Sequence, residues 1–578
     1  MAAVAVAMPL AACSSSGPGS NQSDAASSGT ARGTAKNSAM DASVKGPAPE
    51  IKGAKTGGTL TITTGDSAPP TFDPAGAYYV LSIATLSELV TRSLTGYQIK
   101  DGTPTLVPDM AADLGTPSAD GLTWTFKLKP GMKYSNGQPV KAEDYVYAIK
   151  RSFDPDLGGD GPAPSYLASY LVGGKDYKGV IADPKTDFKG VTAQGDDTVV
   201  FHLTRKWPTL PYYLAFPAAS PIPQAADTKA NYQAKPLATG PYQVKSFTKG
   251  QQFTLEKNPN WDAKSDPIRH QFPNEINVKL GVTALTTQQQ ILANSGTGST
   301  TVDVTGVDAS LASKVKSQKD QFVFGPSPCE SYWPLDTQKI PFEVRKAIAV
   351  AYPYDQIRKA GGVSNLTYDP ATMYAPPQVP GMTPYPPNNG LTGKGPGDPA
   401  KAKQMLKDAG KDGFQLSYYF RNDDPQLVQS NVALKDALSK AGFKVKDVGV
   451  SKEEYSAKRV APNSGMNAGQ GISSWCYDWP SGDSIYPQLF SSTSNAEKQR
   501  SVGNLKDAAI DKEIEQISAM DPAAAAPKWL ALDKKMTAQL VGMPISYSKS
   551  SYVFGSKVHN VINDANHGMP DFAQIWVG

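Results

Sequence analysis

One short stretch of the chain gathers residues that could bind a ligand: "SSWCYDWPSGDS", residues 473–484. Its candidate ligand-binding residues are Trp475, Cys476, Tyr477, Asp478 and Trp479. An ammonium group about 4 Å from a carboxylate such as Asp478 gains on the order of 4 kcal/mol at an effective dielectric constant near 20, against about 1 kcal/mol in water. Aromatic rings nearby exclude water and bind apolar groups or the face of a cation. The stretch indicates a pocket for a positive ligand; a turn-capping aspartate and core tryptophans are the alternatives.

Other candidate chemistry is weaker. "GDSI" at 482–485 and "TGDSA" at 64–68 are short serine-hydrolase-like signatures, but a nucleophile such as Ser484 needs a base and an oxyanion hole. The chain has no GxSxG and no HExxH, and no two of its histidines have metal-ligand spacing. These histidines are His202, His270, His559 and His567. The sequence therefore predicts no catalytic residue, no metal and no cofactor, with a secreted hydrolase as a minor alternative.

The N-terminal residues predict a membrane anchor. A short apolar run ends in "LAAC", which resembles the lipobox of bacterial lipoproteins and predicts lipidation of Cys13 after removal of a signal peptide, residues 1–12. An ordinary secretory signal with an incidental cysteine is the alternative. Residues 13–57 are rich in small and polar residues and predict a disordered tether. No later stretch approaches the roughly 18 apolar residues of a membrane span, so we expect the chain to be anchored rather than inserted.

The two remaining cysteines, Cys329 and Cys476, are 147 positions apart. In an oxidising compartment two remaining thiols are more often paired than free. A disulfide between them would stabilise the fold by about 5 kcal/mol in the loop-entropy description. Two unrelated buried thiols are the alternative.

Composition narrows the class of protein. The 578 residues suffice for two or three substructures. The 57 lysine and arginine residues nearly balance the 53 aspartate and glutamate residues, without a basic cluster. Nucleic acid is therefore excluded as an expected partner.

The periodicity of apolar residues predicts interleaved strands and helices. The segment 121–129 alternates as a strand, with one face made of Leu122, Trp124, Phe126 and Leu128. A helix follows and stops before Pro155. Another is expected between an N-cap at Asp398 and a C-terminal Gly410. A last helix near 524–540 leads into a strand. This order indicates an α/β fold with mixed sheets.

Several of these landmarks, in this order, resemble family 5 of the extracytoplasmic solute-binding proteins of ABC importers, which includes oligopeptide-, dipeptide- and nickel-binding members. The segments that carry the resemblance are "GGTLTITTGD", "LVPDMAADLGTPSADGLTWTFKLKPGMKYSNGQPVKAEDYVYAIKRSFDP", "ATGPYQVKSFTKGQQFTLEKNPNW", "PFEVRKAIAVAY", "DPAKAKQMLKDAGKDGFQLSYYF" and "SSWCYDWPSGDSIYPQLF". The resemblance implies a two-lobe periplasmic-binding-protein-like fold. Lobe I would comprise residues 58–329 and 541–578, and lobe II residues 330–540. The chain would cross between the lobes twice and so form a hinge.

The resemblance also implies roles for individual residues. Asp478 would receive the α-ammonium of a peptide, Cys476 would be bridged to Cys329, and Trp475 would wall the pocket. Tyr547, in the returning strand, is a further match. Some relatives have an arginine for the peptide carboxylate where this chain has Ile472, and a histidine near the position of Gln426. Arg421 would then bind the peptide carboxylate, or no residue of the chain binds it.

We therefore expect a monomeric, lipid-anchored extracytoplasmic receptor that binds oligopeptides between two lobes and delivers them to an ABC permease. It would not be an enzyme. A non-peptide cationic or amine-bearing solute, including a chelated metal, is the alternative ligand. A ligand-sensing receptor is the alternative role.

Overall fold

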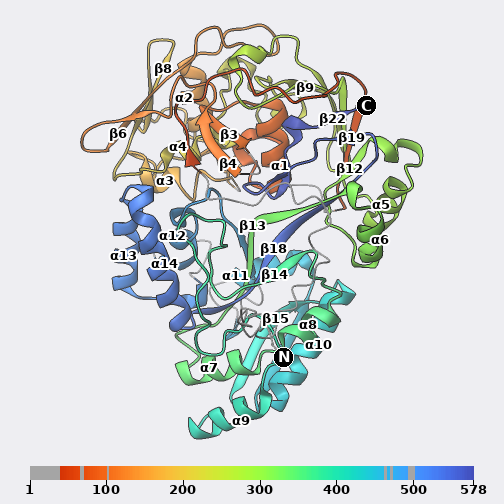
Figure 1. Cartoon of the computed structure of the whole chain (residues 1–578). Coiled ribbons are helices and arrows are strands. Elements are labelled where there is room, and N and C mark those ends of the chain that lie inside the picture. The colour runs from red at the N-terminus through yellow and green to blue at the C-terminus, as the bar shows by residue number, and fades with distance from the viewer. Residues whose placement is uncertain are drawn as a thin grey trace, which may run out of the picture.

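The computed structural model describes residues 39–65, 71–100, 103–159, 161–460, 465–468, 473–492 and 502–578. Figure 1 shows two halves, one above the other, joined by the long strands β13 (Phe322–Pro334) and β18 (Gly542–Phe554). The upper half carries most of the chain before β13, and the lower half most of the chain between β13 and β18. This is the predicted two-lobe α/β arrangement, and we call the halves lobe I and lobe II.

A nine-stranded sheet runs through both lobes in the order β17-β13-β18-β12-β2-β11-β10-β9, with β14 paired to β18. Strand β2 is parallel to β11 and β12, whereas the other pairs are antiparallel, so the sheet is mixed as predicted. Its remaining strands are β2 (Thr59–Thr63), β9 (Tyr242–Thr248), β10 (Gln252–Lys257), β11 (Glu275–Lys279), β12 (Thr301–Asp303), β14 (Tyr368–Pro370) and β17 (Ser473–Cys476).

The hinge is the antiparallel pair β13 and β18. Their register runs from Phe322 opposite Val553 to Pro334 opposite Gly542, with two irregularities between. Both strands therefore pass from one lobe to the other side by side, which is the predicted double crossing. Two covalent connections restrict the lobes to a hinge motion more than one flexible linker would.

Smaller sheets complete lobe I. One has the order β5-β6-β8-β7 and another the order β1-β4-β3. The predicted strand 121–129 is β6, in which Trp124 and Phe126 are buried. The strands are β1 (Ala39–Met40), β3 (Thr95–Lys100), β4 (Thr103–Pro108), β5 (Thr116–Pro117), β6 (Thr123–Lys127), β7 (Val191–Gln194) and β8 (Thr198–His202).

The lobe I helices are mostly short. The helix predicted to stop before Pro155 is α2, which ends at Arg151. They are α1 (Val80–Thr85), η3 (Leu86–Val90, a π-helix), α2 (Ala142–Arg151), α3 (Leu167–Tyr170), α4 (Leu210–Tyr213), α5 (Ala284–Leu292) and α6 (Ala312–Ser317).

Lobe II is richer in helices and contains the parallel pair β15 (Gln415–Arg421) and β16 (Lys444–Val450). In α9 the Asp398 side chain accepts a hydrogen bond from Lys401 N, and Gly410 has φ +62°, so both predicted caps are confirmed. The helices are α7 (Phe342–Ala351), α8 (Tyr354–Ala360), α9 (Pro399–Asp408), α10 (Pro425–Lys440), α11 (Lys452–Val460), α12 (Tyr486–Phe490), α13 (Ala508–Ser518) and α14 (Pro522–Ala538).

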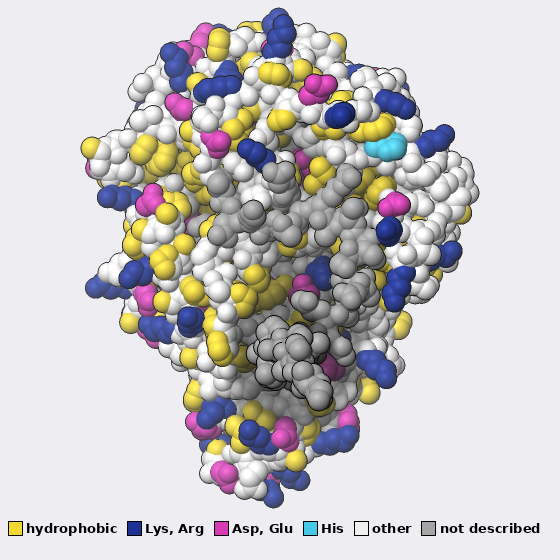
Figure 2. Space-filling view, in the orientation of Figure 1, with side chains coloured by type: hydrophobic (Ala, Val, Ile, Leu, Met, Phe, Trp, Pro, Cys, Tyr) yellow, Lys and Arg dark blue, Asp and Glu magenta, His cyan; other side chains and the backbone are white. Residues whose placement is uncertain are grey.

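Each lobe has its own hydrophobic cores. Lobe I buries one cluster around Phe126 and another around Ile62, while lobe II buries clusters around Ile348 and Trp529. Among the described residues, no helix is both long and apolar enough to cross a bilayer. On the face shown in Figure 2, lysine and arginine side chains are interspersed with acidic ones, in keeping with the nearly balanced charge.

The predicted tether, residues 13–57, is too long at its C-terminal end. Ala39 and Met40 pair in parallel with Thr105 and Leu106 as strand β1. Lys45 Nζ then donates a hydrogen bond to the carbonyl of Ala112 at 2.8 Å. Backbone pairing needs no apolar side chains, so a composition rule for disorder missed it. Cys13 lies outside the described residues.

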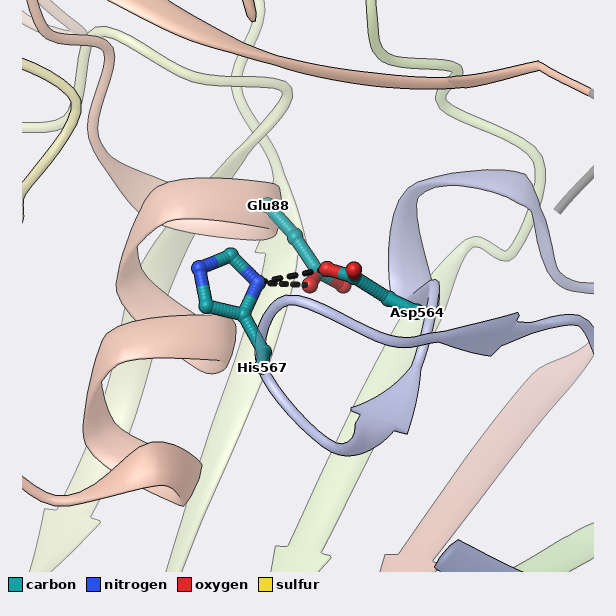
Figure 3. Close-up of side chains that lie close together, drawn as sticks. All are labelled: Glu88, Asp564 and His567. Carbon is teal, nitrogen blue, oxygen red and sulfur yellow. Dashed lines mark hydrogen bonds and ion pairs between the residues drawn. The ribbon is translucent and has the colours of Figure 1, made fainter. Parts of the chain in front are cut away.

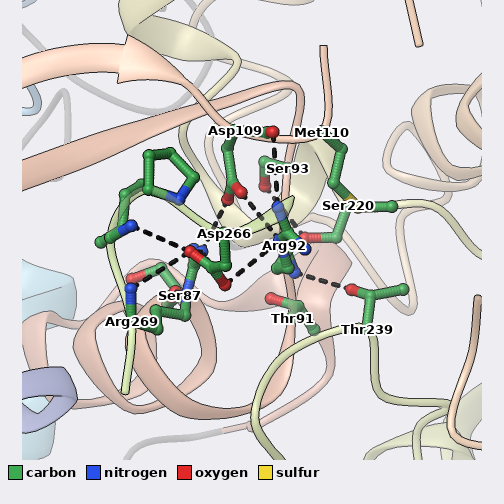
Figure 4. Close-up of polar contacts among 12 residues, drawn as sticks. Ser87, Thr91, Arg92, Ser93, Asp109, Met110, Ser220, Thr239, Asp266 and Arg269 are labelled. Atoms are coloured by element: carbon green, nitrogen blue, oxygen red, sulfur yellow. Dashed lines mark hydrogen bonds and ion pairs between the residues drawn. The ribbon is translucent and has the colours of Figure 1, made fainter. Parts of the chain in front are cut away.

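A buried ion-pair network fixes the segment after the π-helix η3 (Figure 4). Arg92 Nε lies 2.8 Å from Asp109 Oδ1, and Arg269 Nη1 lies 2.8 Å from Asp109 Oδ2. Arg269 also donates through Nε to the carbonyl of Ser87 at 2.7 Å. Burial alone would raise the pKa of Asp266, but the two guanidinium groups hold it below its usual range. The network therefore holds η3, which carries Glu88, in a fixed place.

Candidate ligand-binding site

Strand β17 positions the stretch that the sequence singled out. It pairs antiparallel with β13 of the hinge and stands at the edge of the nine-stranded sheet. Cys476 lies directly opposite Cys329, and a disulfide joins the two, as predicted. The bridge fixes the chain two residues before Asp478, so the start of the following loop is tied to the hinge strand.

Asp478 reaches from this loop to two tyrosines of lobe I. The Tyr78 hydroxyl donates to Asp478 Oδ2 at 2.7 Å, and the Tyr166 hydroxyl donates to the same oxygen. The side chain of Asp478 is half-buried. Burial raises its pKa to about 7, although the two phenol hydrogen bonds lower it. The carboxyl group is therefore poised between its neutral and ionised forms near physiological pH.

A cavity of about 270 Å³ opens beside this carboxyl group, and we call it the Asp478 cavity. Residues of both lobes line it, mostly aromatic: among them Tyr78, Tyr97, Phe216, Trp475, Tyr477 and Asp478. An acidic group inside an aromatic cavity suits a ligand cation, because water is excluded and the rings contact its apolar parts.

A second and larger cavity of about 560 Å³, the Arg421 cavity, lies on the lobe II side of β17. Its lining includes Trp333, Tyr418, Arg421, Asn431, Lys452 and Ser474. Ser474 also lines the Asp478 cavity, so the two cavities adjoin along β17. Trp333 Nε1, Tyr418 Oη and Asn431 Oδ1 are buried without a hydrogen-bond partner among the described residues. Such groups are costly unless a ligand or water satisfies them.

The structure brings most of the predicted site residues together. Trp475, Cys476 and Tyr477 line the Asp478 cavity with Asp478 itself. Arg421 lines the Arg421 cavity, where its Nε lies 3.0 Å from Asp423 Oδ1. Ile472 lies outside the described residues.

Trp479 is not a wall of the Asp478 cavity. It is fully buried within a lobe I core cluster whose other buried members come from residues 83–219. Its ring centroid lies 4.6 Å from that of Tyr166, and its Nε1 donates to Asp483 Oδ1 at 3.1 Å. A tryptophan from the lobe II loop is thus inserted into lobe I.

Tyr547 lines neither cavity. It is buried in the lobe II cluster around Trp529, and its hydroxyl donates to the carbonyl of Met373 at 3.1 Å. The side chain is held by packing and by the backbone, and its predicted ligand contact stays a prediction.

The structure also gives Ser484 a structural role. Its side chain is fully buried, and its Oγ donates to the carbonyl of Trp479 at 2.7 Å. It closes the turn that follows Asp478, and it is not presented to a cavity as a nucleophile would be.

Sequence reasoning missed the residues that lobe I contributes. Tyr78 and Tyr166 lie 400 and 312 positions from Asp478, and neither belongs to a motif. Tyr97, Asn566 and His567 also line the Asp478 cavity. Only tertiary structure brings these segments together, so no local pattern could have found them.

Comparisons with known proteins agree with this architecture. Residues 105–497 match the family described as bacterial extracellular solute-binding proteins, family 5 Middle. The periplasmic oligopeptide-binding protein OppA of Salmonella typhimurium is 29% identical over 273 residues, covering 45% of this chain and 47% of OppA. A dipeptide-binding protein of Lactococcus lactis is 30% identical over 206 residues, covering 32% of this chain and 36% of that protein. The matched region thus spans about half or less of these relatives' length.

Solved structures show the same fold over nearly the whole chain. The clavulanic acid biosynthesis oligopeptide binding protein 2 superposes with a TM-score of 0.80 at 24% identity, covering 91% of this chain and 96% of that one. The family match covers well over half of the chain. The chain therefore belongs to the bacterial extracellular solute-binding proteins of family 5.

Proposed function

We propose that this protein is the substrate-binding receptor of an ABC importer and that it captures oligopeptides between its lobes. It presents the closed form to a membrane permease and carries out no catalysis itself. It acts outside the cytoplasm as a monomer, anchored through lipid on Cys13. Oligopeptide- and dipeptide-binding relatives support this function.

The observation that carries the proposal is the carboxyl group of Asp478 inside an aromatic cavity between the lobes. Both phenols contact Oδ2, so Oδ1 is the oxygen to which a ligand ammonium adds. The ammonium favours the ionised form of Asp478 and lowers its pKa on binding. An ion pair shielded from water is stronger than one in solvent, although desolvation offsets part of the gain.

The edge position of β17 supports a peptide over a small amine. An edge strand offers unpaired backbone N–H and C=O groups to an extended chain, which binds through its own main chain. The two cavities that adjoin at Ser474 follow this edge. A peptide that starts at Asp478 can therefore continue along β17 into the Arg421 cavity. Main-chain recognition tolerates different side chains.

The far end of the ligand is proposed to meet Arg421. This guanidinium lines the larger cavity and is only partly exposed, with Asp423 as its ion-pair partner. A peptide carboxylate would share the guanidinium with Asp423. No positive charge is then needed at the position of Ile472, because Arg421 of β15 supplies the guanidinium for the peptide carboxylate.

The lobes are proposed to be residues 58–329 with 541–578, and 330–540, with β13 and β18 as the hinge. Ligand binding stabilises the closed arrangement in proportion to the difference in affinity between closed and open forms. Contacts made only when the lobes are closed, such as Tyr78 with Asp478, contribute to that difference.

The test is identification of the bound ligand followed by titration. Native mass spectrometry of purified protein should reveal co-purified peptides, and calorimetry should show that tri- to pentapeptides bind. Asp478→Asn should weaken their binding, while Asp369→Asn, at an exposed carboxylate of β14, should not. If amines without a peptide bond bind and no peptide does, the receptor serves a non-peptide solute and the proposal is wrong.

A further inference from the structure

A second group of polar residues lines the Asp478 cavity. Tyr97, Asn566 and His567 line the cavity together with Asp478. The Tyr97 hydroxyl oxygen and Asn566 Oδ1 are buried and have no hydrogen-bond partner among the described residues. Asn566 as a whole is 4% exposed. Buried polar groups are nearly always satisfied, and these two belong to residues that line the cavity.

His567 is held rigidly beside them. It lies in the turn between β20 (Asn563–Asp564) and β21 (Met569–Pro570), which pair antiparallel. Its Nδ1 lies 2.6 Å from Asp564 Oδ2 and 3.3 Å from Glu88 Oε1, and Figure 3 shows the ring's other nitrogen pointing away from both carboxylates. The ring of Tyr97 meets the imidazole edge to face at 6.1 Å.

The carboxylate partners of His567 are themselves fixed. Glu88 Oε2 accepts a hydrogen bond from Phe572 N at 2.6 Å, and Asp564 Oδ1 accepts one from Asn566 N at 2.7 Å. Neither acid is among the residues that line the cavity. The donor atoms of Glu88, Asp564 and His567 lie within 4.8 Å of one another, but they already satisfy each other as an ion-pair cluster around the Nδ1–H.

This environment sets the protonation of His567. Burial alone would lower its pKa, but the carboxylates of Asp564 and Glu88 raise it to about 10. Burial holds the pKa of the nearby Asp571 carboxyl well above its usual range. The imidazole is therefore protonated at neutral pH, and Nε2–H is a hydrogen-bond donor.

We propose that Tyr97, Asn566 and His567 form a subsite for a carboxamide on the residue that carries the ligand's ammonium, such as an N-terminal glutamine. This inference rests on the proposed peptide function. The amide oxygen accepts from His567 Nε2 and from Tyr97, and the amide NH2 donates to Asn566 Oδ1. The cavity has a volume of about 270 Å³, which is smaller than a pocket for a drug-sized ligand. It can therefore hold the ammonium and the carboxamide only if the same ligand residue carries both.

Other side chains fit this subsite less well. An apolar side chain leaves the Tyr97 hydroxyl and Asn566 Oδ1 unsatisfied, and a positive one is repelled by the imidazolium. A carboxylate is attracted by the imidazolium, but it cannot donate to Asn566 Oδ1, and it lies close to the carboxyl groups of Asp478, Asp564 and Glu88. A neutral group with both a donor and an acceptor matches all three residues.

Calorimetry with tripeptides X-Ala-Ala at pH 7.5 tests the subsite, with X as glutamine, methionine, glutamate or lysine. Glutamine should bind about tenfold or more tightly than methionine, which has a similar length, and more tightly than glutamate or lysine. Tyr97→Phe should reduce the ratio of the affinity for the glutamine peptide to that for the methionine peptide several-fold. Tyr213→Phe should leave this ratio unchanged, because it removes another buried hydroxyl that has no partner among the residues the structure describes and that does not line the cavity.

Nitrogen NMR of histidine-labelled protein provides a second readout, because the chain has only four histidines. The Nε2 signal of His567 should shift with the glutamine peptide and not with the methionine peptide. Equal affinities for the two peptides, tightest binding of the glutamate peptide, or a ratio unaffected by Tyr97→Phe would each overturn the subsite. Peptide binding without this discrimination would leave the proposed function standing, whereas failure of every peptide to bind would overturn both.

Discussion

Tyr166 of lobe I donates a hydrogen bond to Asp478, a residue of the lobe II loop that lies 312 positions later in the chain. The same tyrosine packs against Trp479, the next residue of that loop. One side chain therefore contacts both the charged group of the site and the residue that anchors the loop in lobe I. Separation of the lobes would therefore break the contacts of Asp478 and of Trp479 together.

Peptide affinity should depend on pH with a maximum between about pH 7 and 8. The pKa of Asp478 is raised to about 7 in the unliganded protein, so the ionised form that binds an ammonium is lost as the pH falls below that value. Lowering the pH from 7.5 to 5.5 should weaken binding about 20-fold, whereas above about pH 8 the peptide amine itself loses its proton. Calorimetric titrations across this pH range measure the effect. In Asp478→Asn the loss of affinity at low pH, which we call the acidic limb, should vanish. A flat profile for the wild type would contradict the role of Asp478.

Removing either phenol donor should move that acidic limb to higher pH. The hydrogen bonds from Tyr166 and Tyr78 lower the pKa of Asp478 against the effect of burial. Tyr166→Phe should therefore raise the pKa and weaken peptide binding at pH 7 by about tenfold, as expected for a hydrogen bond to a charged group. Calorimetry in buffers of different ionisation enthalpy would reveal larger proton release on binding.

Tyr213→Phe is the matched control for this change, since its ring lies beside that of Tyr166 and its hydroxyl is buried without a hydrogen-bond partner in the described part of the chain. It should leave both affinity and proton release unchanged. If Tyr166→Phe behaves like this control, the hydrogen bond does not tune Asp478.

Trp479→Leu should favour the open form. The tryptophan ring is buried in lobe I only while the loop lies against that lobe, so its loss weakens closure more than the folding of either lobe. We expect a larger radius of gyration by small-angle scattering without ligand and at least about tenfold weaker binding. Trp576→Leu, at a partly exposed tryptophan stacked on His559, should change neither quantity, and an unchanged radius for Trp479→Leu would refute the anchoring role.

Reduction of the Cys329–Cys476 bridge should destabilise the protein. The bridge closes 147 residues of sequence, for which the loop-entropy description gives at most about 5 kcal/mol. The midpoint of urea unfolding should fall in reducing buffer. The double variant Cys329→Ala/Cys476→Ala should be insensitive to the reductant, and equal wild-type midpoints in both buffers would contradict a structural bridge.

The elements with strong local signals could be predicted from the sequence. Strand β6 follows from the alternation around Trp124 and Phe126, and helix α9 from its caps at Asp398 and Gly410. The cystine could be predicted because only two cysteines remained after Cys13. These features depend on residues close in sequence or on simple counting.

The lobe I residues of the site could not be predicted, because they lie far from Asp478 in the sequence. Tyr78 and Tyr166 reach Asp478 only through the packing of one lobe on the other. Trp479 was misplaced because an aromatic residue next to a binding aspartate suits a core as well as a wall. The resemblance assigned Tyr547 to the ligand, but it could not show that the hydroxyl donates to the carbonyl of Met373.

The most direct test of the central claim is the effect of N-terminal acetylation on peptide binding in wild type and in Asp478→Asn. Acetylation removes the ammonium and leaves the rest of the peptide intact. It should weaken binding to the wild type by about 30-fold or more, the usual cost of leaving one partner of a buried charge pair alone, and should have little effect on the variant. Equal affinity of the wild type for the free and the acetylated peptide would contradict the role of Asp478 as the ammonium receptor.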